Sequence, residues 1–422
     1  MTAEQPLDPE AWLGSLDPIG WRFGLERITA LLAELGDPQH SFESIHVVGT
    51  NGKSSVTTMT AALVEASGRR TGAYLSPHSE RWAQRVRVAG RAVSPASFAG
   101  AVERVAAGIE VVEPSFAEGE RVTQFEAATA VAFVALADAG VEVGVIEAGL
   151  GGRLDATNVL RSRATVLTSI GLDHTAWLGE TELEIAAEKL AVLRPGSTLI
   201  VGNLSPEVAS LARRQAAERG CDLREAADLP GGLAVAAPYL RRNLGVAIAA
   251  AETVAGRLDD VVVRDVVGSL ELPGRFELEP GDPPFVLDAA HNPDGAAALA
   301  EALALELGAP PVVACLAILA DKDAEGIVEA LAPALAAVVC TEIPPARLEG
   351  AGRPGTSSVP AAELVRLCES AAVPATAVLD PARAIALTSA MAHARGGVAL
   401  VAGSHYLLGY RWTEKPAQSS CR

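Results

Sequence analysis

The chain has 422 residues, which is too long for one ordinary hydrophobic core, so two or three domains are expected. Its formal net charge of −18 excludes the favourable electrostatics on which nucleic-acid binding depends. The five cysteines include no Cys-x-x-Cys pair, which argues against a disulfide framework and a zinc site, and no apolar run is long enough to cross a bilayer. With no apolar signal core near the N-terminus either, we expect a cytoplasmic protein that binds neither nucleic acid nor membrane.

The first strong pattern is a strand, a glycine turn and a helix around residue 50. Residues 45–48 resemble a strand, apolar residues at helical spacing run on to residue 64, and the turn between them is Gly49-Thr50-Asn51-Gly52-Lys53-Ser54-Ser55. Such a turn leaves N–H groups unpaired at a helix N-terminus, where negative charge is favoured. Lys53 adds a positive charge, and the two serines add hydroxyls able to face a metal ion. We predict a phosphate cradle; because two residues stand where the usual P-loop has four, an ordinary strand-to-helix turn is the alternative.

An arginine-rich segment follows the next predicted strand, which ends at Ser76. Its cations are Arg81, Arg85, Arg87 and Arg91, in a chain that is otherwise acidic. Two interpretations stay open, a solvated strand face and a site that recognises an acidic substrate.

Three predicted strands bring polar side chains to one edge of a parallel sheet. One ends at Ser76, the apolar strand 141–146 leads into Glu147, and the strand 164–170 leads into His174. Because ligands of open parallel sheets bind beyond the carboxyl ends of the strands, we expect these residues beside the glycine turn. A hydroxyl, a carboxylate and an imidazole at a phosphate site predict a magnesium shell completed by water. Taken singly, each residue would be interpreted as solvated or structural.

The helix after this region opens with a capping box, Thr181 to Glu184, and carries Lys189 among its apolar positions. A lysine there either extends to water or becomes a desolvated, partly neutral amine. Farther on, Leu272-Pro273-Gly274-Arg275 breaks the chain before a second α/β alternation, with strands at 285–288, 312–319, 336–341 and 398–401. We therefore place a domain boundary at this break.

Taken together and in this order, the motifs resemble the folylpolyglutamate synthases and bifunctional dihydrofolate synthases of the Mur ligase superfamily. The resemblance covers nearly the whole chain. Besides the glycine turn, it is carried by residues 23–28, Ser76-Pro77-His78, Phe125-Glu126, 147–158, 169–175, Glu188-Lys189, 273–275, 288–293 and 321–323. Departures from the family pattern include Ser54 and Ala289 at usual glycines, and Tyr239-Leu240 in place of a common His-Gln pair.

The resemblance implies an α/β fold with an N-terminal P-loop-type parallel-sheet ATPase domain (1–272) and a smaller C-terminal Rossmann-like α/β domain (273–422). It implies an ATP-dependent amide ligase that adds L-glutamate to folates, and to dihydropteroate, through an acyl phosphate. The expected cofactor-binding residues are Gly49, Thr50, Asn51, Gly52, Lys53, Ser54, Ser55, Asn243, Arg275 and Asp288, and the expected Mg²⁺ ligands are Ser76, Glu147 and His174. The expected residues of the pterin or folate pocket are Thr123, Gln124, Phe125, Glu126, Leu154, Asp155 and Ala156.

Three side chains are expected to take part in the chemistry. Lys53 would offset phosphate charge, Lys189 matches a lysine that family members carbamylate, and His291 is a candidate for removing a proton from the glutamate ammonium. The alternatives are an enzyme limited to folylpolyglutamate synthesis, a P-loop small-molecule kinase and a nucleotide-binding regulator without turnover. A peptidoglycan-building ligase would need a UDP-binding domain before Gly49, for which 48 residues are too few. We expect a monomer.

Overall fold

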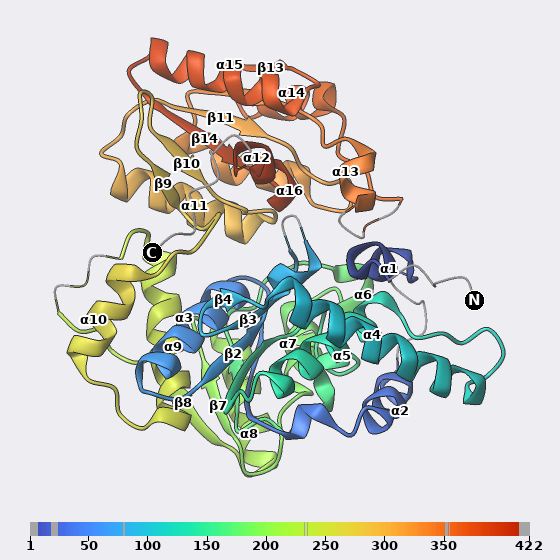
Figure 1. Cartoon of the computed structure of the whole chain (residues 1–422). Coiled ribbons are helices and arrows are strands. Elements are labelled where there is room, and N and C mark those ends of the chain that lie inside the picture. The colour runs from blue at the N-terminus through green and yellow to red at the C-terminus, as the bar shows by residue number, and fades with distance from the viewer. Residues whose placement is uncertain are drawn as a thin grey trace. The chain divides into compact units, whose positions relative to one another are not determined.

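The structure is a computed structural model that describes residues 7–17, 24–78, 81–231, 233, 235–350, 353 and 355–412 (Figure 1). Phe23, part of one family motif, lies outside these residues. The chain forms two compact units, the first made of residues 1–234 and 242–270 and the second of residues 235–241 and 271–422. The second unit thus resumes at Glu271, close to the boundary expected from the sequence, but it also includes residues 235–241, which we did not foresee.

The described part of the first unit is built on an eight-stranded sheet with the order β4-β3-β2-β5-β1-β6-β7-β8. The strands are β1 (Glu43–Val48), β2 (Thr71–Tyr74), β3 (Val86–Val88), β4 (Arg91–Ala92), β5 (Val143–Glu147), β6 (Ala164–Leu167), β7 (Thr198–Val201) and β8 (Asp222–Glu225). All neighbours are parallel except β3, which is antiparallel to both β2 and β4. The central strands are apolar and buried, as expected for a parallel sheet covered by helices.

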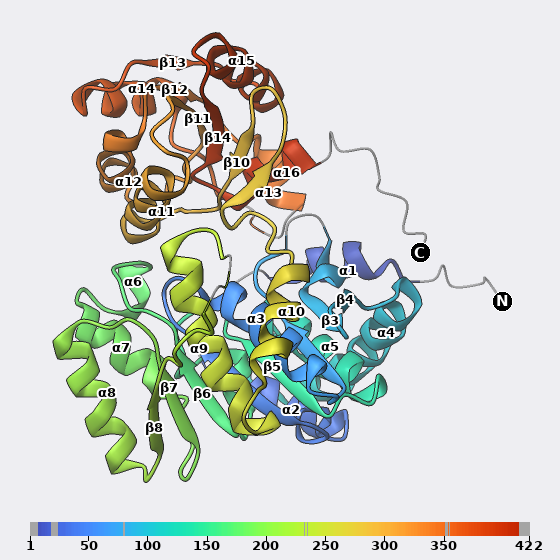
Figure 2. The ribbon, with the colours of Figure 1, turned by 90° about the vertical axis from the view of Figure 1, so that its left-hand side faces the viewer.

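Helices surround this sheet, as Figure 2 shows from the side. They are α1 (Pro9–Ser15), α2 (Glu26–Glu34), α3 (Lys53–Ala66), α4 (Pro95–Val112), α5 (Gln124–Asp138), α6 (Thr175–Leu178), α7 (Glu182–Leu190), α8 (Pro206–Glu218), α9 (Pro238–Ala255) and α10 (Asp260–Ser269). Helix α3 packs on β1, β2 and β5, whereas α5 packs against α2 and α4. The predicted capping box at Thr181 is present and starts α7.

The described part of the second unit contains a six-stranded sheet with the order β13-β12-β11-β14-β10-β9. Its strands are β9 (Glu277–Glu279), β10 (Phe285–Leu287), β11 (Val312–Leu316), β12 (Ala337–Cys340), β13 (Ala375–Ala377) and β14 (Val398–Ala402), and only β9 is antiparallel to its neighbour. Its helices are α11 (Pro293–Glu306), α12 (Ala324–Leu331), α13 (Pro345–Gly350), α14 (Ala361–Ser370), α15 (Pro381–Ala394) and α16 (His405–Trp412). The α/β fold class with two parallel-type sheets is confirmed.

The order of the strands determines where the predicted site residues meet. Strands β2, β5, β1 and β6 are consecutive neighbours and run parallel, so their carboxyl ends share one edge. The strands end earlier than predicted, β2 at Tyr74 and β6 at Leu167, and the segments that follow carry Ser76 and His174 as loop residues.

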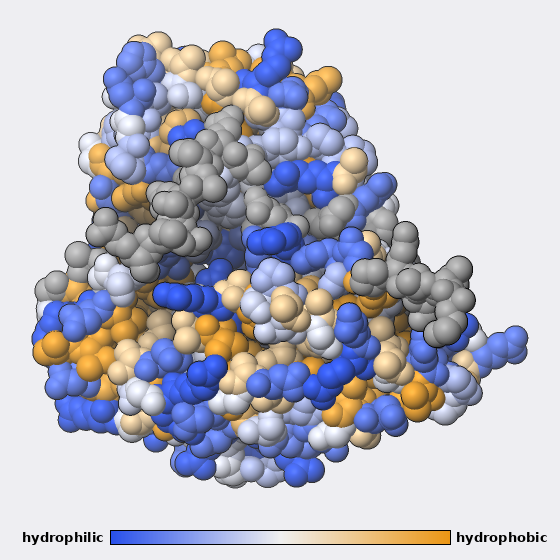
Figure 3. All heavy atoms as spheres, in the orientation of Figure 1, coloured by the Kyte–Doolittle hydropathy of each residue, from blue (hydrophilic) through white to orange (hydrophobic). Residues whose placement is uncertain are grey.

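No helix in the part of the chain that the structure describes has the length and apolarity needed to span a bilayer. On the face drawn in Figure 3, hydrophilic and hydrophobic residues are interspersed.

Candidate active site

The turn between β1 and α3 requires glycine at two positions. Gly49 and Gly52 have φ angles of +152° and +83°. A Cβ atom at Gly49 would lie 1.9 Å from Thr168 Oγ1, and one at Gly52 would lie 2.7 Å from Asn243 Oδ1. Asn243, one of the expected ATP-contacting residues, therefore lies directly against the turn. Since neither position has room for a side chain, the backbone of the turn is what this surface presents.

The segment after β6 holds the turn in place. The Thr50 N–H donates to the Ser169 carbonyl over 2.8 Å, and the Thr50 hydroxyl donates to the Gly171 carbonyl over 3.1 Å. The Asn51 N–H donates to Ser169 Oγ over 3.1 Å. A segment 118 to 121 residues farther along the chain thus holds the turn in place.

Lys53 is the first residue of α3, and its side chain folds back over the turn. Its Nζ donates to the carbonyl oxygens of Gly49 and Thr50 over 3.0 and 3.1 Å. The ammonium is thereby held at the helix N-terminus, where the backbone dipoles also favour an anion.

Glu147, at the end of β5, is 1% exposed and is held from two sides. Ser54 Oγ donates to its Oε1 over 2.9 Å, and the Ser76 N–H donates to its Oε2 over 3.1 Å. The neighbouring Ser55 Oγ is buried and lacks a hydrogen-bond partner among the residues described. A buried carboxylate bonded to a serine hydroxyl supplies oxygen ligands of the kind that magnesium prefers, so Glu147 and Ser54 fit the ion.

His174 lies in the loop beyond β6, in the left-handed region with a φ of +52°. Its Nε2 is 3.8 Å from Asp173 Oδ1, and its side chain is 34% exposed. Within the described ranges, no group of three or more His, Cys, Asp and Glu side chains gathers as a metal site. The ligand set of Ser76, Glu147 and His174 therefore stays a prediction.

Lys189 in α7 is 4% exposed, so of its two interpretations the desolvated amine is the one that the structure supports. Burial and the Lys53 cation lower its pKa to about 7, against the opposing effect of Asp173, Asp155 and Glu188. The loop after β5 rests on this part of α7, because the Arg153 N–H donates to the Glu188 carbonyl over 3.0 Å.

On the expected pterin side, an aromatic ring covers the start of the loop after β5. A Cβ atom at Gly149 would lie 2.3 Å from Cζ of Phe125, which is half-buried. In the same loop Leu154 is half-buried, whereas Asp155 and Ala156 are buried. Phe125 and Leu154 thus keep exposed surface that a ligand can contact.

Three other residues expected in this pocket serve the fold. Thr123 and Glu126 form the capping box of α5, and Glu126 also pairs with Arg27 over 3.1 Å, with both side chains buried. Gln124 Nε2 donates to the Leu13 carbonyl over 2.9 Å. These bonds occupy the Glu126 and Gln124 side chains within the protein.

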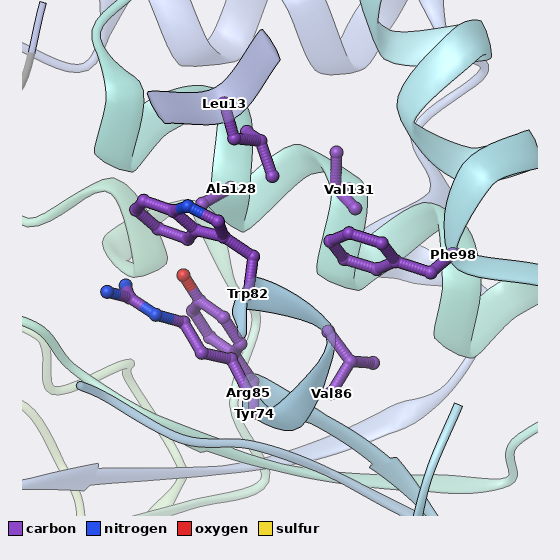
Figure 4. Close-up of a pocket in the computed structure, with 8 residues that line it drawn as sticks. All are labelled: Leu13, Tyr74, Trp82, Arg85, Val86, Phe98, Ala128 and Val131. Atoms are coloured by element: carbon purple, nitrogen blue, oxygen red, sulfur yellow. The ribbon is translucent and has the colours of Figure 1, made fainter. Parts of the chain in front are cut away.

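The arginine-rich segment has both exposed and buried members. Arg81 and Arg91 are exposed, as a solvated face requires. Arg85 is buried, stacks 4.1 Å above the Trp82 ring and donates from Nε to His78 Nδ1 over 2.8 Å. Figure 4 shows Arg85 at one side of an apolar pocket lined by Leu13, Tyr74, Trp82, Val86, Phe98, Ala128 and Val131.

In the second unit, Asp288 is at the centre of a hydrogen-bonded cluster. Its carboxylate accepts hydrogen bonds from the Tyr239 hydroxyl over 2.5 Å and from the N–H groups of Phe276 and Ala290 over 2.9 and 2.8 Å. Burial raises the pKa of Asp288, and the nearby Arg275 cation opposes that shift. Tyr239 was not among the site residues expected from the sequence, although its departure from the family pattern was the available signal.

His291 follows Asp288 in the same loop. Its Nδ1 is 2.8 Å from the Ala289 carbonyl oxygen, which can only accept, so Nδ1 carries a proton. In the neutral ring the basic lone pair is then on Nε2, which is what a general base requires.

Comparison with known proteins identifies the family. Residues 274–405 match the Mur ligase glutamate ligase domain. The dihydrofolate synthase/folylpolyglutamate synthase of Mycobacterium tuberculosis is 36% identical over 358 residues, which cover 75% of this chain and 74% of that protein. The chain belongs to the dihydrofolate synthase/folylpolyglutamate synthase family.

Solved structures extend the family match to nearly the whole chain. Folylpolyglutamate synthase from Mycobacterium tuberculosis, complexed with ADP, has a TM-score of 0.87 at 30% identity and covers 97% of this chain and 98% of its own. The bifunctional folylpolyglutamate synthase/dihydrofolate synthase from Yersinia pestis, complexed with AMPPNP and Mn ion, has a TM-score of 0.82 at 29% identity, covering 98% of this chain and 99% of its own. The family resemblance inferred from the motifs is confirmed.

Proposed function

We propose that this protein is an ATP-dependent ligase that joins L-glutamate to folates, and to dihydropteroate, by an amide bond. The observation that carries the proposal is the rigid glycine turn with Lys53 over it and Glu147 beside it, in a chain of this family. ATP would bind with its terminal phosphates at the turn. A relative that holds ADP and another that holds AMPPNP with Mn ion support this choice.

The residues of the turn fit a nucleotide with its metal ion. The N–H groups at the start of α3 and the Lys53 ammonium would hold the phosphates. Glu147, the Ser54 and Ser55 hydroxyls, Ser76 and His174 are the candidates to hold magnesium. Magnesium, when bound, would stabilise negative charge on the phosphate oxygens as a Lewis acid.

The reaction we propose has two displacements. A carboxylate oxygen of the pterin or folate acid attacks the γ-phosphorus of ATP, and ADP leaves, which gives an acyl phosphate. The glutamate amine then attacks the acyl carbon, and inorganic phosphate leaves. This chain would position the reactants and neutralise their charge, with Lys53 closest to the phosphates by its place over the turn.

Two titratable side chains have roles in this scheme. His291 Nε2 is the candidate to take a proton from the glutamate ammonium, which must lose it before the amine can attack. Lys189, a buried amine with a pKa of about 7, is the candidate for carbamylation. The neutral amine would attack CO2 and release a proton, and the carbamate would face the site as an anion.

Phosphate release from ATP by the purified protein tests the function. It should require both a pterin or folate acid and L-glutamate, and mass spectrometry should find the glutamylated product. ADP formation that does not depend on glutamate, with a phosphorylated acid as product and no free phosphate, would instead indicate a small-molecule kinase.

The same assay determines the breadth of the substrate range. We expect both dihydropteroate and tetrahydrofolate to accept glutamate. Turnover of tetrahydrofolate alone would restrict the enzyme to folylpolyglutamate synthesis. The monomeric state and the cytoplasmic location stay predictions.

A further inference from the structure

A buried histidine in β1 is connected to the expected pterin pocket by a chain of hydrogen bonds. His46 Nε2 is 2.7 Å from Thr157 Oγ1, and the Thr157 hydroxyl donates to Asp155 Oδ1. The three residues are 1%, 0% and 5% exposed. Neither His46 nor Thr157 was a candidate site residue from the sequence.

The available protons determine which group donates and which accepts in each of these hydrogen bonds. The carboxylate of Asp155 can only accept, so the single Thr157 hydroxyl proton points toward it. Thr157 Oγ1 then accepts from His46 Nε2, which must carry a proton. Burial, together with the Arg194 cation, lowers the pKa of His46 to about 3, so the ring is neutral and is present as the Nε2–H tautomer.

Asp155 closes the loop after β5 through further hydrogen bonds to backbone N–H groups. Its Oδ2 accepts from the Leu150 N–H over 2.8 Å, and its Oδ1 also accepts from the Thr157 N–H over 2.9 Å. The carboxylate therefore joins the start of the loop to its end. Leu150 follows Gly149, on which the Phe125 ring lies, so this closure sets the distance between the ring and the loop.

Arg194 holds the C-terminal part of the same loop. Its Nη2 donates to Asn158 Oδ1 over 2.8 Å, and its Nε donates to the Leu160 carbonyl over 2.7 Å. His46, in turn, is in the strand that leads directly into the phosphate cradle, three residues before Gly49. The loop of the pterin pocket is thus anchored to the strand that delivers the cradle.

From this arrangement we propose that His46 and Thr157 are positioning residues for the pterin or folate acid. They hold Asp155, and through it residues 149–157, in the shape that faces the Phe125 ring. The proposal rests on the proposed function, because it assigns the pocket to the pterin acid. It predicts an effect on binding of that acid and none on binding of ATP.

Paired variants of Thr157 test the proposal in the full-length protein. Thr157→Val keeps the shape but removes the hydroxyl, and it should raise the KM for dihydropteroate about tenfold while the KM for ATP stays within about twofold. Thr157→Ser, which keeps the hydroxyl, should restore the wild-type KM. Thr165→Val is the matched control, since Thr165 lies opposite His46 in β6 and its buried hydroxyl has no hydrogen-bond partner among the described residues.

Variants of His46 provide a second test of the proposal. His46→Gln offers an amide N–H in place of the ring N–H and should behave like Thr157→Ser, whereas His46→Leu should behave like Thr157→Val. An unchanged KM for dihydropteroate in Thr157→Val, or an equal rise in the KM for ATP, would overturn the positioning role while the ligase function stands. Absence of glutamate-dependent turnover in the wild-type protein would overturn the function and this proposal with it.

Discussion

Lys53 and Glu147 carry opposite charges beside one turn, and each is held by neighbours before any substrate is present. Lys53 is bonded to two carbonyls of the turn, and Glu147 to the Ser54 hydroxyl and the Ser76 N–H. Side chains fixed in this way need little reorganisation when charge develops on the phosphates, which is the main source of rate enhancement at such sites.

Replacing Lys53 therefore affects turnover more than stability. Lys53→Ala should lower kcat by about a hundredfold or more, because a single cation is lost where phosphate charge develops. Steady-state phosphate release measures the effect. Arg104→Ala, which removes an exposed cation of α4 paired with Asp138, is the control and should keep wild-type turnover. A Lys53→Ala protein with unimpaired turnover would show that the cradle does not hold the reacting phosphates.

The Ser55 hydroxyl offers a sharper test of the metal site. Because it is buried without a hydrogen-bond partner among the described residues, Ser55→Ala should leave the unfolding midpoint nearly unchanged. It should nevertheless lower activity and raise the magnesium concentration needed for half-maximal rate. Thr60→Val in the same helix removes an equally buried hydroxyl and should change neither quantity. Equal magnesium titrations of both variants would exclude Ser55 as a ligand.

The pKa of Lys189 gives a pH dependence with a definite sign. Only the neutral amine reacts with CO2, and this form becomes the major one as the pH rises through about 7. At constant dissolved CO2, native mass spectrometry should find the carbamylated fraction rising over that range. Lys189→Arg, which cannot form the carbamate, sets the baseline. A fraction that stays at this baseline at every pH would contradict the carbamylation proposal.

In helix α5, a residue of a family motif stabilises the fold. Its N-terminus is joined to α2 by the Arg27–Glu126 pair, whose side chains are 7% and 6% exposed. Removing one partner leaves a buried charge without compensation, so Glu126→Gln should lower the free energy of unfolding by about 3 kcal/mol or more. Asp138→Asn breaks an exposed pair on the same helix, and its effect should stay below about 1 kcal/mol. Chemical unfolding that finds the two variants equally stable would contradict this role.

The strands and the helix around the cradle were predictable from the sequence. The apolar pattern of each segment and the parallel pairing of the strands indicate the same arrangement there. The apolar runs before Gly49 and Glu147 are buried strands, and parallel pairing brings their ends together without further information. The helix after Lys53 follows from apolar spacing and the glycine turn. Ser54 and Glu147, both candidates from the sequence, are hydrogen-bonded to each other there.

Other features depend on packing that the sequence does not encode locally. The two-residue strand β4 and the antiparallel β9 lack a periodic pattern long enough to recognise. Residues 235–241 fold with a unit that resumes thirty residues later, so Tyr239 meets Asp288 only in three dimensions. The bond between His46 and Thr157 likewise joins residues 111 positions apart.

The molecule as a whole is acidic, whereas the substrates that we propose for it are anions. With a net charge of −18, from 52 acidic residues against 34 lysines and arginines, it repels ATP, glutamate and a folate acid at long range. The cations at the cradle and near Asp288 therefore act only on nearby charge. Lys53 is bonded to its own turn, and Arg275 donates to the Gly274 carbonyl over 3.0 Å. We propose that substrate charge is neutralised at these positions.

In the reaction that we propose, ATP activates the acid by phosphorylating its carboxylate before glutamate attacks. Dihydropteroate whose carboxyl group carries a heavy oxygen isotope tests this directly, with the released phosphate analysed by mass spectrometry. We predict that one labelled oxygen moves from each acid molecule into the phosphate as glutamate is added. Glutamylated product formed together with unlabelled phosphate would exclude an acyl phosphate intermediate.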